Sequence, residues 1–280
     1  MRSRQEASKL RVKFWGVRGS TPTPQRENLG FGGNTSCLEV RGAGDEILIF
    51  DGGTGLRQLG IALLKEFKKK KFRAHFFFTH CHWDHIQGIP FFDPLYRDEN
   101  EVVFYAPPTP NDLRGVLMGQ MATPYFPVNF ESVAIKRSFV QLETGPVKCG
   151  GLTIHSFPVN HPQGAVGYRV ESAGKAMVYA TDMEAGNERL DGIVRDFSQN
   201  ADLLIHDAQY TDQEIKMKRG WGHSTWGEAV QAAKDAKAGQ LILFHHDPSH
   251  DDQFVREIVK KARRKFDHTK AAREGWFVEL

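Results

Sequence analysis

The segment that most constrains this chain is His80–His85, which reads His-Cys-His-Trp-Asp-His directly after an apolar run ending at Thr79. Imidazole nitrogens and carboxylate oxygens bind zinc and similar first-row ions. A lone histidine is usually structural, but four such groups close together would be costly to desolvate without a metal. Side chains that alternate along a tight loop can also serve two adjacent ions. The motif therefore predicts a metal centre at the end of a strand.

The rest of the chain predicts an α/β fold in which short strands alternate with amphipathic helices. Leucines at helical spacing predict a helix over 56–67, and the last helix is expected over 252–266. Thr225 and Glu228 form a capping-box pattern that marks the start of another helix. Strands are expected over residues 11–15, 36–40, 46–50, 73–79, 101–105, 152–157, 166–171, 176–180, 202–206 and 240–244.

Composition excludes several classes of protein. The 280 residues are 40% apolar, and no run approaches the roughly 18 apolar residues that a membrane-spanning helix needs. Residues 1–10 are polar and do not resemble a secretory signal, so the cytoplasm is the expected location. Cys37, Cys81 and Cys149 are too few and too scattered for a disulfide framework and are expected to be reduced. A net charge of +3, from 37 basic and 34 acidic residues, does not predict a nucleic-acid-binding protein.

From Val12 to about Pro248 the sequence resembles the metallo-β-lactamase superfamily. The resemblance implies a four-layer αββα sandwich, a single domain over 1–280 and a lid-like insertion over 89–131. It also implies two divalent metal ions, with zinc favoured and manganese or iron left open. The resemblance implies that His80, His82 and His161 hold one ion, that Asp84, His85 and His245 hold the second, and that Asp182 bridges both.

Two further assignments come from the same resemblance. His245 is preferred over the adjacent His246 because "LILFHHDP" matches the family's strand followed by a ligand histidine. Asp51, in "FDGGTG", matches the superfamily's first motif, whose carboxylate orients a ligand histidine; capping a turn is the alternative role. No metal role is expected for His75, His155, His250 and His268.

Other strings distinguish among branches of the superfamily. "HDAQY" at His206–Tyr210, "GHST" at Gly222–Thr225 and "HPQGAVGYRV" from His161 resemble ribonuclease Z-like phosphodiesterases. Asp182 follows His161 by 21 positions, which leaves no room for the long arm that ribonuclease Z carries for transfer RNA. His82 stands where oxygen-reducing members have a glutamate, so that branch is not expected. The strings "FWGVRGSTPTP", "FGGNTSC" and "THCHWDHIQGIPFF" resemble bacterial chains described as 3′,5′-cyclic-nucleotide phosphodiesterases or as metal-dependent hydrolases.

The expected function is hydrolysis of a small phosphodiester, with a 3′,5′-cyclic nucleotide as the favoured substrate. Two adjacent ions can lower the pKa of a bound water and neutralise charge during in-line attack by the resulting hydroxide. His223 and Asp207 are expected to form a proton-handling pair, and Asp84 to serve catalysis as well as metal binding. The alternatives are a metal-dependent acyl hydrolase such as a thioesterase or lactonase, ribonuclease Z-like RNA processing, and a binding module without activity. Neither a membrane nor a large nucleic acid is an expected partner, and a homodimer is left open.

Two sets of residues are candidates for contact with the substrate. Gly32 and Gly33, followed by residues 34–36, are expected to place backbone amides near a phosphate or to form a purely structural turn. The insertion over 89–131 is expected to wall the mouth of the site and stack on a base, or to pack as a lid with no ligand role. Its apolar candidates are Phe91, Phe92, Tyr96, Tyr105, Met118, Met121, Tyr125 and Phe126.

Overall fold

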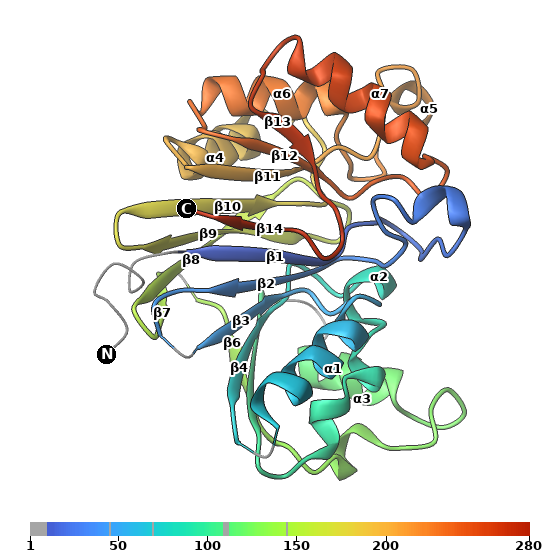
Figure 1. The fold of residues 1–280 in the computed structure, drawn as a ribbon, viewed down its shortest axis with the longest axis vertical. Helices are drawn as coiled ribbons and strands as arrows, with labels where there is room; N and C mark the ends of the chain where they lie inside the picture. Colours follow the sequence, from blue (N-terminus) through green and yellow to red (C-terminus); the bar gives the residue numbers. More distant parts are fainter. Residues whose placement is uncertain (1–9, 45, 69, 109–111, 144) are drawn as a thin grey trace.

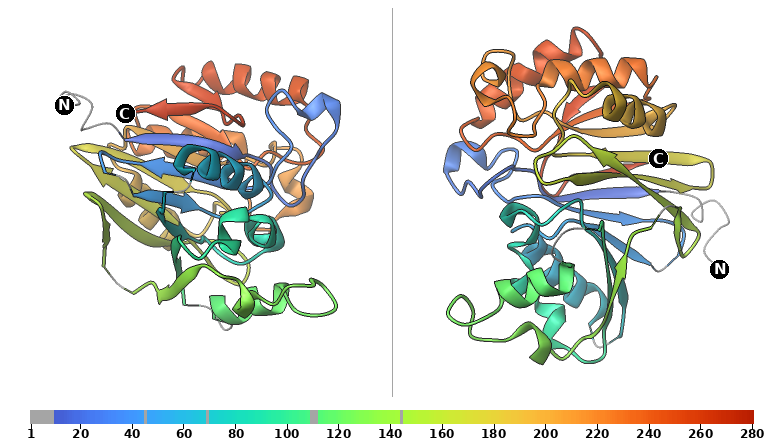
Figure 2. Two further views of the ribbon diagram at one scale, coloured as in Figure 1. Left: turned by 60° about the horizontal axis from the view of Figure 1, so that its bottom comes forward. Right: turned by 180° about the vertical axis from the view of Figure 1, so that it is seen from behind.

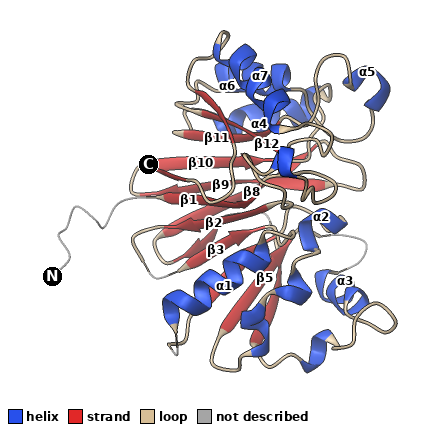
Figure 3. Cartoon of the chain, turned by 45° about the vertical axis from the view of Figure 1, so that its right-hand side comes forward, coloured by secondary structure: helices blue, strands red, loops and turns tan. Residues whose placement is uncertain are grey.

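The chain folds into four layers, in which two facing β-sheets lie between two layers of helices (Figure 1). The computed structural model describes residues 10–44, 46–68, 70–108, 112–143 and 145–280. Figure 3 shows strands in the middle of the molecule and helices on both outer sides. The αββα sandwich implied by the sequence resemblance is therefore confirmed.

The first sheet mixes antiparallel with parallel pairing. From edge to edge it contains β14 (Phe277–Glu279), β1 (Arg11–Gly16), β2 (Cys37–Arg41), β3 (Ile47–Phe50), β4 (Arg73–Phe77), β5 (Glu101–Ala106) and β6 (Lys136–Gln141). Strands β14 to β3 pair antiparallel, whereas β3 to β6 pair in parallel. Because β3 and β4 are parallel, the loops after them, which carry Asp51 and His80, emerge at the same edge.

The second sheet also combines parallel with antiparallel pairing. From edge to edge it contains β13 (Thr269–Ala271), β12 (Leu241–Phe244), β11 (Leu203–Asp207), β10 (Lys175–Ala180), β9 (Ala165–Ser172), β8 (Leu152–Val159) and β7 (Val147–Cys149). Strands β13 to β10 are parallel, and β10 to β7 are antiparallel. The carboxyl ends of β10, β11 and β12 meet at one edge, which brings Asp182, Asp207 and His245 to the same place.

Helices cover the outer face of each sheet (Figure 2). The helices beside the first sheet are α1 (Leu56–Phe67), α2 (Trp83–Ile86) and α3 (Leu113–Gln120). The helices beside the second sheet are α4 (Glu188–Ser198), α6 (Trp226–Asp235) and α7 (Asp252–Arg263). The short helix α5 (Ile215–Lys218) precedes α6. Helix α1 has the predicted bounds and buries Leu56, Leu59 and Leu63 in the core. Helix α6 begins at the predicted capping box of Thr225 and Glu228.

An aromatic core joins the two sheets. Phe50 and Phe77, from the first sheet, contact the ring of Tyr168 in the second at centroid distances of 5.2 and 5.7 Å. All three side chains are fully buried. Burial of a phenylalanine side chain contributes roughly 1.5–3 kcal/mol, so this layer holds the two sheets together and fixes the edge at which their loops meet.

The predicted insertion over 89–131 lies partly within the first sheet. It contains β5, which pairs with β4 and β6 inside the first sheet. Phe92, Tyr105 and Met121 are buried in the core, so the expectation that they wall the mouth of the site is wrong. The other apolar candidates of the segment, which are exposed or half-buried, are Phe91, Tyr96, Met118, Tyr125 and Phe126.

Two expectations from composition can be compared with the structure, and a third cannot. No helix in the described part of the chain is long and apolar enough to cross a membrane. Cys37, Cys81 and Cys149 are all free thiols. Residues 1–9, on which the expectation about a secretory signal falls, lie outside the described residues.

Candidate metal centre

The seven predicted metal ligands come together in two adjacent groups at the edge where the strands end. The three-histidine group consists of His80, His82 and His161, and the mixed group consists of Asp84, His85, Asp182 and His245. Within each group, one ligand atom from every residue lies within 4.8 Å of the others. The loops after β4, β8, β10 and β12, together with the short helix α2, supply these residues, so the site depends on both sheets.

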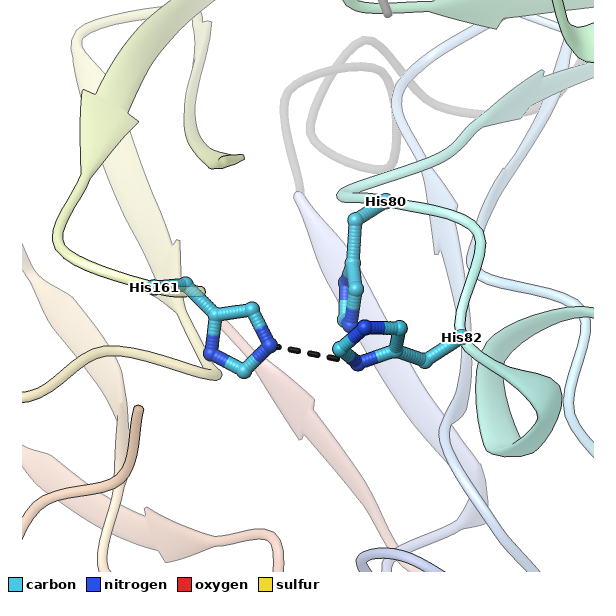
Figure 4. A group of neighbouring side chains, drawn as sticks. All are labelled: His80, His82 and His161. Carbon is cyan, nitrogen blue, oxygen red and sulfur yellow. Dashed lines mark hydrogen bonds between the residues drawn. The ribbon is translucent and has the colours of Figure 1, made fainter. Parts of the chain in front are cut away.

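The three-histidine group joins side chains from opposite sheets (Figure 4). His80 and His82 come from the loop after β4, and His161 faces them from the loop between β8 and β9. The Nε2 of His161 lies 3.2 Å from the Nδ1 of His82. Two ligands about 2.1 Å from one tetrahedral zinc ion would be about 3.4 Å apart, so this spacing suits a shared ion.

Asp182 lies between the two groups. Its Oδ2 is 3.3 Å from the Nε2 of His85 and 3.3 Å from the Nε2 of His245. Its Oδ1 is 3.8 Å from the Nε2 of His80, in the three-histidine group. Asp84 completes the mixed group, with its Oδ2 3.2 Å from His245 Nε2. This is the position that a bridging carboxylate requires.

Orphaned nitrogen atoms show that the donor set fits metal ions. The Nε2 atoms of His80 and His85 are buried and, among the described residues, have no hydrogen-bond partner. A buried polar atom without a partner is costly, and a metal ion would use the lone pair of each. Imidazole and carboxylate groups together are donors that suit zinc, manganese or iron.

The backbone at the site adopts conformations that side chains normally avoid. Asp51, Asp182 and His245 have φ values of 59°, 53° and 61°, in the left-handed region. Such residues persist where surrounding contacts over-determine them, and they cluster at functional sites. Each of the three follows directly or closely on a strand end, so a sharp reversal of the chain turns its side chain toward the cluster.

Asp51 holds the ring of His85 from behind. Its Oδ2 lies 2.9 Å from His85 Nδ1 and accepts a hydrogen bond from the Tyr179 hydroxyl at 2.9 Å. Its Oδ1 accepts the backbone N–H of Thr79 at 2.8 Å. The Thr79 hydroxyl also lies 3.0 Å from the Nδ1 of His80. These contacts leave the Nε2 atoms of both histidines facing the cluster, as the predicted orienting role requires.

The structure gives the adjacent residues His245 and His246 different surroundings. His245 turns into the mixed group, and its Nδ1 donates to Gln209 Oε1 at 2.7 Å. His246 turns away and lies 3.1 Å from the carbonyl oxygen of Ala272. Burial, together with the positive charge of Arg18, lowers the pKa of His246 to about 3. The geometry therefore places His245, and not His246, among the candidate ligands.

The carboxylates and the histidines of the mixed group strongly affect one another's pKa values. Burial alone would raise the pKa of the Asp84 and Asp182 carboxyls, but the neighbouring His85 and His245 hold both well below their usual range. Burial opposes the charged form of His85, yet the nearby carboxylates raise its pKa well above the usual value. In the three-histidine group, burial lowers the pKa of His80. The two groups therefore differ in their own side chains, because only the mixed group contains carboxylates, although Asp182 also lies 3.8 Å from His80.

His223 and Asp207 form a pair beside the ligands. The Nδ1 of His223 lies 2.9 Å from Asp207 Oδ2, and the rings of His223 and His245 stack with centroids 4.9 Å apart. Asp207 also accepts the backbone N–H groups of Asp182 at 3.0 Å and Ser224 at 3.0 Å. Burial works against the charged imidazole, but the Asp207 carboxylate raises the pKa of His223 to about 9. One atom each of Asp207, His223 and His245 also lies within 4.8 Å of the others, so this pair adjoins the metal ligands.

Amides of the glycine-rich turn are bonded within the protein. Glu274 accepts the backbone N–H of Asn34 at 2.5 Å, and Thr54 Oγ1 accepts that of Thr35 at 2.9 Å. The N–H of Gly32 is bonded to the carbonyl oxygen of Asn28 at 3.0 Å. Because the amides of Gly32, Asn34 and Thr35 already have partners, the structural alternative is favoured for these three residues.

Sequence reasoning missed several residues that contact the ligands. Gln209, which contacts His245, lies in the quoted string "HDAQY", but nothing in that string shows that its amide faces a histidine. The carbonyl oxygen of Gly222 accepts from His161 Nδ1 at 3.0 Å, and a backbone atom leaves no trace in residue type. Gln163 Oε1 lies 3.2 Å from His82 Nε2, just after His161 in the chain.

Comparison with known proteins agrees with this geometry. A family model described as "Beta-lactamase superfamily domain" matches residues 47–246, a range that includes Asp51 and all seven candidate ligands. The chain belongs to the beta-lactamase superfamily. Within this superfamily, the chain is similar to ribonuclease Z of Haloarcula marismortui, with 25% identity and coverage of 92% of each chain.

Two solved structures show the same fold. The metallo-beta-lactamase fold protein YhfI from Bacillus subtilis has a TM-score of 0.74 and 21% identity, and the match covers 98% of this chain and 100% of that one. A diphosphatase from the PhnP family has a TM-score of 0.70 and 17% identity, with 97% of each chain covered. The fold shared with these structures thus extends over nearly the whole chain.

Proposed function

We propose that this superfamily member is a dinuclear metal-dependent phosphodiesterase that hydrolyses a small phosphodiester, with 3′,5′-cyclic nucleotides as the substrate class. The observation that supports the proposal is the pair of adjacent ligand groups, with Asp182 of the mixed group 3.8 Å from His80 of the other and with His223 and Asp207 beside them. Two of the similar proteins are named a ribonuclease and a diphosphatase. Those names favour phosphate chemistry over the acyl hydrolysis that the same donor set could also support.

The connection between two ligands supports a small substrate. His161 and Asp182 are joined by the hairpin of β9 and β10, which pairs from Tyr168 with Tyr179 to Ser172 with Lys175. The hairpin is an ordinary part of the second sheet, so no arm projects there to grip a folded RNA. The near-neutral charge of +3 offers little of the electrostatic attraction that binds many phosphates at once.

The seven candidate ligands would hold two ions. When bound, the ions would lower the pKa of a water molecule and neutralise negative charge on a phosphoryl group. The ligand assignments of the proposal are His80, His82 and His161 for one ion, Asp84, His85 and His245 for the other, and Asp182 for both. Asp84 also accepts the backbone N–H of Ser20 at 2.7 Å, a contact that holds its carboxylate in place.

His223 would handle the proton on the leaving oxygen. Cleavage of a phosphodiester leaves an alkoxide, which departs slowly unless it is protonated. Asp207 engages Nδ1 of His223, so Nε2 is the atom that remains to donate. Asp207 itself is held by backbone N–H donors, so the imidazole has a fixed orientation. General acid catalysis of this kind contributes about 10²–10⁴-fold in rate.

Exposed aromatic rings beside the ligands suit a nucleobase. Trp83 stands between the ligands His82 and Asp84 and is 64% exposed, and Trp221 lies two residues before His223 and is 60% exposed. Large apolar side chains that are this exposed lack a packing role, whereas stacking on a base contributes about 1–3 kcal/mol. These rings replace the buried aromatics of 89–131 as the proposed stacking surface.

A substrate panel on metal-reconstituted protein tests the proposal. The panel contains 3′,5′-cyclic nucleotides, linear dinucleotides, a 3′-extended transfer-RNA precursor and a set of thioesters and lactones. We expect the highest kcat/KM for a cyclic nucleotide and poor cleavage of the precursor. Site-specific processing of the precursor without turnover of cyclic nucleotides would favour a ribonuclease Z-like function instead. Hydrolysis of thioesters or lactones alone would favour the acyl hydrolase, and no hydrolysis by metal-loaded protein would favour a binding module.

A further inference from the structure

Glu184 is a buried carboxylate that none of the roles above explains. It lies two residues after Asp182 and is 8% exposed. Its carboxylate accepts the backbone N–H of Gly220 at 2.7 Å and that of Gly222 at 3.0 Å. Arg219 Nη1 is 3.7 Å away, on a guanidinium that is half exposed. The main bonds of this carboxylate are therefore to the backbone of one loop.

The backbone of Glu184 is tied to the residue that precedes a candidate ligand. The N–H of Glu184 donates to the carbonyl oxygen of Asn160 at 2.8 Å, and the Asn160 side-chain amide donates to the carbonyl oxygen of Glu184 at 2.8 Å. His161 follows Asn160 directly. Glu184 thus contacts both the chain that carries His161 and the loop that packs on its ring.

Gly222 completes the contact with His161. Its N–H is bonded to Glu184, and its carbonyl oxygen accepts from His161 Nδ1 at 3.0 Å. With the proton on Nδ1, the Nε2 lone pair faces His82 and the rest of the three-histidine group. Gly222 has a φ of +85°, and a Cβ atom there would lie 2.2 Å from His161 Nδ1. The loop and the ring are therefore in direct contact, with no space for adjustment.

We propose that Glu184 is a positioning residue for the metal ion of the three-histidine group. Its carboxylate holds Gly222 so that the Gly222 carbonyl keeps His161 in the Nδ1–H tautomer and directs Nε2 at the ion. The mixed group lies outside this chain of contacts, because Asp51 and Gln209 orient its histidines instead. Loss of Glu184 therefore weakens one metal site and spares the other. The inference rests on the proposed metal centre but not on the identity of the substrate.

The variants are Glu184→Ala, Glu184→Gln and Gly222→Ala, with Glu188→Ala as the matched control at an exposed glutamate four residues later. Zinc is titrated calorimetrically into metal-free protein, and the tautomer of His161 is read from ¹⁵N chemical shifts in the same protein. Glu184→Ala should lower the affinity of one of the two zinc sites by about 10–100-fold and leave the other unchanged. It should also lose the pure Nδ1–H signature of His161.

The two other variants test the same contacts between Glu184, Gly222 and His161. Glu184→Gln keeps one oxygen that can accept both glycine N–H groups, so it should retain most of the affinity. Gly222→Ala should act like Glu184→Ala, because its methyl group displaces the His161 ring, and it carries the test if Glu184→Ala does not fold. Unchanged zinc affinities and an unchanged His161 tautomer in Glu184→Ala or Gly222→Ala would overturn the proposal. Both readouts are independent of hydrolysis, so failure to cleave any phosphodiester would overturn the proposed function alone.

Discussion

The Nδ1 atom of His85 lies 2.9 Å from the Oδ2 atom of Asp51, and both side chains are fully buried. Asp51 also receives the Tyr179 hydroxyl and both the N–H and the hydroxyl of Thr79, so its two oxygens satisfy four donors. An amide in its place offers one accepting oxygen, so at least one of these donors would lose its partner. We expect Asp51→Asn to lower the metal affinity of the mixed group by about 10–100-fold. Calorimetric titration of metal-free protein checks this, with the exposed Asp196→Asn as control, and equal affinities in the two variants would contradict it.

Substitution of the adjacent histidines should give opposite results. His245→Ala removes a donor from the mixed group, so we expect it to lose one ion per chain. His246→Ala should keep both ions and lose only stability, because its imidazole contacts Ala272 and not the ligands. Elemental analysis after gel filtration, together with urea unfolding, distinguishes the two. Loss of metal from His246→Ala alone would reverse the assignment.

Removal of the shared carboxylate should affect both ions. Asp182 lies within 3.3 Å of His85 and within 3.8 Å of His80, which belong to different groups. We therefore expect two ions per chain in the wild type and reduced occupancy of both sites in Asp182→Ala. Zinc titration with a chromogenic chelator measures the two occupancies. An effect confined to one site would show that Asp182 does not bridge.

The loss of turnover in His223→Ala should depend on the leaving group of the substrate. For a cyclic nucleotide, whose leaving oxygen needs a proton, we expect turnover to fall at least about a hundredfold. For a p-nitrophenyl phosphodiester, whose leaving group needs little protonation, the loss should be smaller. Metal content measured in parallel should stay at two ions. Equal losses on both substrates would favour a role in substrate binding, and loss of metal would make His223 a ligand.

His75, remote from the ligands, should make the fold sensitive to acid. Burial and the charge of Arg73 lower the pKa of His75 in the folded protein. The unfolded chain, with a histidine pKa of about 6.5, then binds a proton at a higher pH than the folded one, so stability falls as the pH drops below about 6.5. Urea unfolding of metal-free protein at pH 7.5 and pH 5 should show a smaller drop for His75→Gln than for the wild type. An equal drop in both proteins would rule out this contribution.

Local patterns predict local structure in this chain. The leucines of α1 and the capping box of α6 lie within one helix each, so their bounds can be predicted from neighbouring residues alone. The short strand β14 cannot be predicted in this way. It has three residues, and its partner β1 lies at the other end of the described chain.

In the site, too, residues that belong to local motifs could be predicted, and contacts between distant segments could not. His80–His85 is one contiguous motif, and the remaining ligands follow from a resemblance that also rests on short strings. The partners of those ligands are different, because they depend on which backbone groups meet in space. Glu274, 240 positions away in the sequence, accepts the Asn34 amide of the glycine-rich turn, and no local pattern reveals this contact.

The pairing of β1 with β14 has a consequence for synthesis on the ribosome. Arg11 pairs with Glu279, which follows it by 268 positions, and the buried Arg18 donates to the carbonyl oxygens of Asp247 and His250. A nascent chain therefore leaves β1 with an open edge and Arg18 without these acceptors for most of translation. His245 also emerges late, so the mixed group cannot be complete on a chain that ends before it. Completion of the metal centre is in that sense a late event in synthesis, because it depends on His245 and not only on the early motif His80–His85.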